Sequence, residues 1–137
     1  MNKIIEQLKF FFTDRKDVIA VYLFGSQAKG IEHEQSDVDI ALLFERGKEP
    51  LLQDHLKLMT ELSTLLRKEA DVIILNSADP ILKCQVFRYG TIVLERDRIT
   101  SRRFVAKSIM EYIDLQYNRG IVERAMYKRL EKGASNG

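Results

Sequence analysis

Seven consecutive apolar residues near the amino terminus constrain the fold of this chain most strongly. Residues 18–24, Val-Ile-Ala-Val-Tyr-Leu-Phe, are rich in β-branched and aromatic side chains and end at Gly25. A strand that is apolar on both faces must be covered on both faces, as the central strands of α/β proteins are. Two further apolar runs, residues 37–44 and 71–75, predict a second and a third buried strand.

The segments between and after these runs have helical periodicity. Helices are expected over residues 2–12, 51–68, 80–89 and 100–131, and a short edge strand over residues 91–94. Asp79 before Pro80 is a typical helix start, and Gly90 suits a left-handed helix end. Gly120 can kink or divide the last helix, and the tail from Gly133 is expected to fray. The pattern predicts a single α/β domain with a C-terminal helical extension.

Length and charge set the organisation. The 137 residues support a single domain, and the net charge of +2 is too balanced to indicate a nucleic-acid binder. The charge is unevenly distributed, however. Residues 96–137 hold ten basic and five acidic side chains, whereas residues 1–95 hold twelve basic and fifteen acidic ones. We therefore expect a core over residues 1–95 and a basic extension over residues 96–137 that binds a partner.

The cellular compartment is indicated by three features. Cys84 is the single cysteine and cannot form an internal disulfide, which is typical of a reducing compartment. The amino terminus lacks the apolar stretch of a signal peptide, and no uncharged run approaches about 20 residues, the length that spans a membrane. We expect a cytoplasmic protein without a membrane partner.

The residues that indicate chemistry lie where the first strand ends and the second begins. Gly25-Ser26 follows the first apolar run and, after ten residues, Asp37-Val38-Asp39 opens the second. A Gly-Ser turn can present backbone N–H groups and a hydroxyl to a phosphate, and Lys29 adds a nearby cation. Asp37 and Asp39 leave the same face of a strand, with Cα atoms about 6.6 Å apart, and two such carboxylates can converge on divalent cations.

A third carboxylate is placed in the same way. Asp71 opens the third apolar run and is a candidate to face Asp37 and Asp39. Carboxylates at the margin of a buried sheet need cations or solvent, because burying them without partners is costly. Taken singly, an Asp-x-Asp pair or a Gly-Ser turn is commonplace, and the order of strand, turn, loop and paired carboxylates is what favours a catalytic site.

This segment resembles the Gly-Ser-x10-Asp-x-Asp signature of the DNA polymerase β-like nucleotidyltransferase superfamily. The short chain and the strand at residues 71–75 are similar to its minimal members, the MNT-domain antitoxins that pair with HEPN-domain toxins. The resemblance implies the polymerase β-like fold, an α/β (α+β) arrangement of a small mixed β-sheet with flanking helices and a C-terminal helical extension. It places the nucleotidyltransferase core over residues 1–95. It also implies roles for six residues. Gly25, Ser26 and Lys29 would contact the nucleotide phosphates. Asp37, Asp39 and Asp71 would bind Mg²⁺, and Asp71 would also activate the acceptor hydroxyl. Many relatives carry Arg where this chain has Lys29, which keeps the charge but loses the bidentate fork.

The reaction that the resemblance implies is protein adenylylation. ATP would donate AMP to a tyrosine of a HEPN ribonuclease toxin, with Mg²⁺ as cofactor, and thereby neutralise the toxin. Two alternatives stay open: a non-catalytic antitoxin that acts by occlusion, and an enzyme that adenylylates an antibiotic. The second alternative usually needs a sizeable substrate-binding domain, for which residues 96–137 are short.

The remaining polar candidates have ordinary structural explanations. His33 and His55 are far apart in sequence, lack ligand spacing and are interpreted as surface residues, and Cys84 as a packing residue. A basic cluster precedes the last helix. Its members are Arg96, Arg98, Arg102 and Arg103. The cluster is either a solvated helix entry or a docking site, for an acidic partner surface or for the triphosphate.

Overall fold

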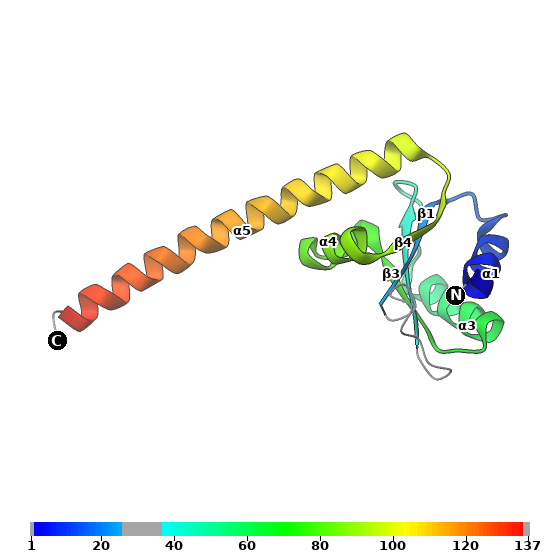
Figure 1. Cartoon of the computed structure of the whole chain (residues 1–137), viewed down its shortest axis with the longest axis horizontal. Coiled ribbons are helices and arrows are strands. Elements are labelled where there is room, and N and C mark those ends of the chain that lie inside the picture. Colours follow the sequence, from blue (N-terminus) through cyan, green and yellow to red (C-terminus); the bar gives the residue numbers. More distant parts are fainter. Residues whose placement is uncertain (1, 26–36, 136–137) are drawn as a thin grey trace.

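The computed structural model describes residues 2–25 and 37–135 (Figure 1). In this part of the chain, four strands form one sheet in the order β3-β2-β1-β4. The strands are β1 (Val18–Phe24), β2 (Val38–Phe44), β3 (Ala70–Ile74) and β4 (Thr91–Glu95). The helices are α1 (Asn2–Phe12), α3 (Leu52–Leu66), α4 (Pro80–Tyr89) and α5 (Arg98–Ser135), with a short 3-10 turn, η1 (Leu75–Ser77).

The sheet is mixed, as predicted. β1 pairs antiparallel with both β2 and β4, and β2 pairs parallel with β3. The three apolar runs form β1, β2 and β3, and the strand expected at residues 91–94 lies at the edge as β4. The α/β prediction of a small mixed sheet with flanking helices is therefore confirmed.

Both faces of the sheet are covered by helices, which explains why the strands are so apolar. Leu8 of α1 and Leu62 of α3 pack on one face, against Val38 and Ile40. Val86 of α4 packs on the other face, in a second cluster that also includes residues of β1, β2 and α5. That second cluster includes Tyr22, Ala41, Leu43, Phe87 and Phe104. Even-numbered residues of β2 therefore face α1 and α3, and odd-numbered residues face α4.

The helix α4 begins as predicted and ends differently. Asp79 caps its start, since its Oδ1 accepts a hydrogen bond of 2.9 Å from the Leu82 N–H. Gly90 has φ −78°, so the left-handed end expected there is wrong. Glycine is needed for another reason: a Cβ at Gly90 would lie 2.5 Å from the Val86 carbonyl oxygen and 3.4 Å from that of Leu23. The glycine therefore leaves room for the Val86 carbonyl in the last turn of α4.

The helix α5 is longer than predicted and is not divided at Gly120. It runs unbroken from Arg98 to Ser135, including part of the tail expected to fray, and projects from the body (Figure 1). Ser101 and Ser108 are buried near its start, whereas the described side chains from Ile113 onward are exposed. This free part is about 33 Å long at 1.5 Å per residue. Among the described residues, no helix has the length and apolarity needed to cross a membrane.

Candidate functional site

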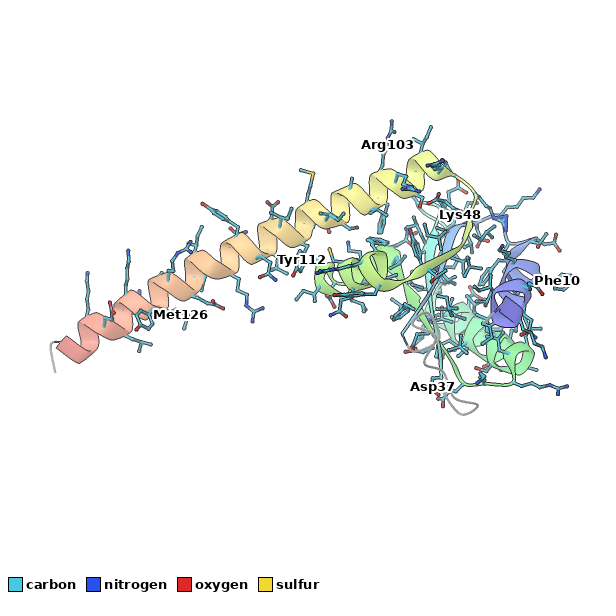
Figure 2. All side chains as sticks on the ribbon, viewed as in Figure 1. Phe10, Asp37, Lys48, Arg103, Tyr112 and Met126 are labelled. Carbon is cyan, nitrogen blue, oxygen red and sulfur yellow. The ribbon has the colours of Figure 1, made fainter. Side chains whose placement is uncertain are left out.

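Three carboxylates lie at one end of the sheet. Asp39 of β2 is paired in parallel register with Asp71 of β3, so the two side chains leave the same face from neighbouring strands. Asp37 lies just before β2 and is exposed at the same end (Figure 2). Asp39 is also in register with Phe24, the last residue of β1, which brings Gly25 beside it. The structure therefore places Gly25, Asp37, Asp39 and Asp71 at the same end of the sheet.

The Asp39 carboxyl has an unfavourable environment for its charge. Burial raises its pKa above the usual range, and the negative charges of Asp71 and then Asp37 raise it further. A divalent cation would remove this repulsion, because it neutralises carboxylates that cannot easily be protonated at neutral pH. The electrostatics of the cluster thus fit a site for a cation or for another positively charged group.

Gly25 is packed directly against Asp39. Its φ is +74°, in the left-handed region, and a Cβ at this position would lie 2.2 Å from Oδ2 of Asp39. Any other side chain would occupy the space of the carboxylate group. The glycine therefore serves the site in two ways, by allowing the turn after β1 and by leaving room for Asp39.

Some predicted site residues lie outside the part of the chain that the structure describes. Ser26, Lys29 and His33 lie outside the described residues. Within residues 2–25 and 37–135, no three or more His, Cys, Asp or Glu side chains converge as ligands of one metal ion. The Mg²⁺ role of Asp37, Asp39 and Asp71 stays a prediction, as do the phosphate contacts of Gly25.

The basic cluster lies at the opposite end of the sheet from these carboxylates. The start of β4 pairs with Leu23, near the carboxylate end, and Arg96 follows the other end of β4, where its N–H bonds the Ile19 carbonyl. Strand β1 separates the two ends by about 20 Å. Figure 2 shows Arg103 at the start of α5 and Asp37 at the far end of the sheet. The interpretation of the cluster as a triphosphate site is therefore wrong.

Arg96 has a structural role that the sequence did not reveal. Its guanidinium donates hydrogen bonds to the Phe12 carbonyl and, at 3.1 Å, to the Val18 carbonyl. These acceptors belong to the end of α1 and the start of β1, so Arg96 ties three elements together. Arg102 lies 3.8 Å from Glu95, while Arg98 and Arg103 are exposed. Of the four arginines, Arg98 and Arg103 fit a solvated helix entry or a partner contact.

His55 is the residue near the site that sequence reasoning misplaced. Instead of lying free at the surface, its Nε2 is 2.6 Å from the carbonyl oxygen of Val72, the residue after Asp71. Strand β3 is at the sheet edge, where backbone groups need partners outside the sheet, so His55 helps to hold the strand that carries Asp71. The spacing in the sequence could have indicated this position, because His55 lies four residues before Met59 and seven before Leu62, on the side of α3 that faces the sheet.

The raised pKa of Asp39 predicts that this residue costs stability at neutral pH. Because the folded-state pKa is raised, the contribution of Asp39 to stability is present below its ordinary value of 3.8 and is lost as pH rises through the raised value. Asp39→Asn should therefore raise the Tm of the metal-free protein at pH 7 by a few degrees, about 4 °C per kcal/mol for a domain of this size. The difference should vanish near pH 3.

Thermal unfolding at several pH values tests this expectation. Asp114→Asn, an exposed change on α5, is the matched control and should leave Tm unchanged. Mg²⁺ should raise the Tm of the unaltered protein at pH 7 and have little effect on Asp39→Asn. A lower Tm for Asp39→Asn at pH 7 would contradict the assigned electrostatics.

Comparisons with known proteins agree with this site. Residues 6–99 match the family described as polymerase beta, nucleotidyltransferase. The chain is 31% identical over 118 residues to the protein adenylyltransferase MntA of Shewanella oneidensis, which covers 86% of this chain and 81% of MntA.

Solved structures give the same result. A chain of a toxin–antitoxin crystal structure with AMP-PNP matches with a TM-score of 0.77 and 27% identity, over 89% of this chain and 98% of that one. A chain from the complex of a tri-AMPylated Shewanella oneidensis HEPN toxin with MNT antitoxin matches with a TM-score of 0.70 and 25% identity, over 92% and 99% of the two chains. The family match covers more than half of the chain, and MntA is 31% identical to it over 118 residues. The chain therefore belongs to the polymerase beta nucleotidyltransferase family.

Proposed function

We propose that this protein is an Mg²⁺-dependent adenylyltransferase antitoxin, which transfers AMP from ATP to a tyrosine of a HEPN ribonuclease toxin and so neutralises it. The observation that carries the proposal is the position of Asp37, Asp39 and Asp71 at the same end of the sheet, with Gly25 packed against Asp39. Two of the similar proteins support this proposal. MntA is named a protein adenylyltransferase, and the similar MNT antitoxin was solved in complex with an AMPylated HEPN toxin. ATP as donor implies a compartment that supplies ATP, so we place the protein in the cytoplasm.

The metal and the nucleotide would share the carboxylate end of the sheet. Asp37 and Asp39, with Asp71 as a third candidate, would hold Mg²⁺, which usually takes one or two carboxylates and completes its shell with water and substrate phosphates. Bound there, Mg²⁺ would neutralise charge on the triphosphate and on the leaving group. The turn that begins at Gly25, with Ser26 and Lys29, would hold the phosphates. Gly25 leaves space for this approach because it has no side chain.

The transfer itself requires one proton acceptor and one leaving group. The acceptor tyrosine oxygen attacks the α-phosphorus, and the bond from that phosphorus to the bridging oxygen breaks in line, releasing pyrophosphate. Asp71, exposed at the start of β3 beside Asp39, would accept the tyrosine proton. Positioning by the turn and the sheet, together with neutralisation of charge, accounts for most of the catalysis in such a site.

The toxin would dock on the C-terminal extension, residues 96–137. The free part of α5 exposes large apolar side chains that the body leaves uncovered. Examples are Ile113, Tyr117, Ile121, Val122, Met126 and Tyr127. Apolar side chains of this number on one projecting helix indicate a surface that a partner covers. The basic excess of the same segment favours an acidic partner surface.

Charged substitutions on α5 should separate docking from nucleotide binding. Ile113 and Tyr117 are one helical turn apart on one side of α5 and are 58% and 66% exposed. Changing both to Glu should weaken toxin binding at least tenfold, because each would place a charge in an apolar contact, while ATP affinity stays the same. The control adds the same charge at polar positions of the helix, Gln116→Glu with Asn118→Glu. Equal losses in both variants, measured by calorimetry, would count against docking on this side.

A direct assay tests the proposed function. The protein is incubated with Mg²⁺, labelled ATP and its co-purifying partner, and mass spectrometry then determines whether a tyrosine of the partner gains AMP. Modification with loss of ribonuclease activity is the expected result. Tight binding without modification would instead favour occlusion, and modification of an aminoglycoside but of no protein would favour a small-molecule enzyme.

A further inference from the structure

The direction of α5 is decided by a short stretch of the helix. Residues 101–112 pack against the body, and the following 33 Å or so projects without burial of any described side chain. A rigid helix held only at one end behaves as a lever, so a 10° rotation at Glu111 displaces its far end by about 6 Å. Contacts near Glu111 therefore determine where a toxin docked on α5 lies relative to the carboxylates.

The contact at this position is an ion pair between α4 and α5. Lys83 Nζ is 2.9 Å from Oε2 of Glu111, at the point where α5 leaves the body. The Lys83 side chain is only 8% exposed and its ammonium lies 5.2 Å from the centre of the Phe104 ring. A lysine this buried needs a charged partner, and the hydrogen bond from Lys83 lowers the pKa of Glu111. The pair therefore holds a specific angle between the two helices.

The helix α4, which carries Lys83, also packs against the strand that leads to the carboxylate site. Phe87 of α4 contacts Tyr22 of β1, with ring centres 5.5 Å apart, and the Gly90 N–H donates to the Val86 carbonyl at 2.7 Å. Gly90 also packs against Leu23, two residues before Gly25. The helix α4 is thus fixed to the strand that ends at the site, so the ion pair sets α5 relative to that site.

We propose that Lys83 and Glu111 are positioning residues for AMP transfer. Their ion pair orients α5 so that a toxin docked on it presents its tyrosine to the nucleotide. In-line attack needs the reacting atoms about 3–3.5 Å apart, which a displacement of several ångströms at the docking surface would prevent. The inference rests on the proposed function, but it concerns residues that touch neither nucleotide nor metal.

Kinetics of two variants test the proposal. Lys83→Met removes the ammonium while keeping an apolar side chain of similar length, and Glu111→Gln removes the negative charge while keeping the shape. Both should lower kcat for AMP transfer to the toxin at least tenfold, with toxin affinity and ATP affinity within threefold of the original values. Lys83→Arg, which can restore the ion pair, should recover most of kcat. The matched control is Lys57→Met, which breaks an exposed pair with Glu61 within α3 and should have no effect.

A distance measurement separates failure of this inference from failure of the proposed function. Spin labels at Lys48→Cys and Met126→Cys, in a Cys84→Ala background, report the direction of α5 relative to the sheet (Figure 2). The unaltered pair should give one narrow distance, and Lys83→Met should broaden or shift it by several ångströms. An unchanged distance, an unchanged kcat, or a loss confined to toxin affinity would overturn the positioning role. If the original protein transfers no AMP, the proposed function fails, and the distances still decide whether the pair orients α5.

Discussion

A variant that carries both Asp37→Asn and Asp39→Asn is expected to lose AMP transfer by about 10³-fold or more. The two carboxylates lie at the start of β2. Burial, and then the charges of Asp71 and Asp37, raise the pKa of Asp39, and a bound cation would offset both effects. Asparagine keeps the shape of each side chain but removes the charge that would hold Mg²⁺. Because charge neutralisation supplies much of the rate in phosphate transfer, the reaction should lose more than a single hydrogen bond would contribute.

The same variant decides between catalysis and occlusion. Its affinity for the toxin should stay within about twofold, since the docking helix α5 is unchanged. Asp54→Asn on α3, exposed and away from the site, serves as the control. Rates are measured by AMP incorporation and neutralisation by residual ribonuclease activity. If the double variant neutralises the toxin fully without modifying it, occlusion rather than catalysis explains the antitoxin activity.

Gly25→Ala should reduce AMP transfer about a hundredfold or more. A Cβ would lie 2.2 Å from Oδ2 and 3.2 Å from Cγ of Asp39, so the carboxylate or the turn must move. A displacement of about 1 Å in a positioned catalytic group is enough for a loss of about 10². The left-handed φ of +74° adds a backbone cost of about 1–2 kcal/mol for any residue with a Cβ.

A second glycine supplies the matched control for this steric effect. Gly47 has a similar φ of +86°, but a Cβ there meets nothing within 4 Å. Gly47→Ala should therefore show the backbone cost alone, as a lower Tm with unchanged kcat/KM, whereas Gly25→Ala should show both losses. Equal activity of the two variants would mean that the contact between Gly25 and Asp39 is unimportant.

The strands and the carboxylate motif were predictable because they depend on local sequence. Residues 18–24 and 72–75 are continuous apolar runs, which a small domain can bury only as strands covered on both faces. The period of two along a strand then puts Asp37 and Asp39 on one face, whatever the rest of the chain does. The proximity of Asp71 was also inferred, and the parallel register of β2 and β3 produced it.

The misplaced residues depend on partners that are distant in the sequence. Arg96 looked like part of a basic surface, but its acceptors are carbonyls about 80 residues earlier in the chain. His55 bonds the edge of β3. Local patterns cannot reveal such contacts, because they arise only when separate elements pack together.

The sequence by itself determined the strands, the spacing of the carboxylates and the presence of a basic C-terminal extension, because these follow from side-chain periodicity and composition. Only the tertiary structure decided that Gly25 contacts Asp39, that the arginine cluster lies at the far end of the sheet, and that α5 projects as one helix whose angle depends on Lys83 and Glu111. The physical reason is that periodicity specifies which face a side chain occupies, whereas the packing of distant elements specifies what that face meets.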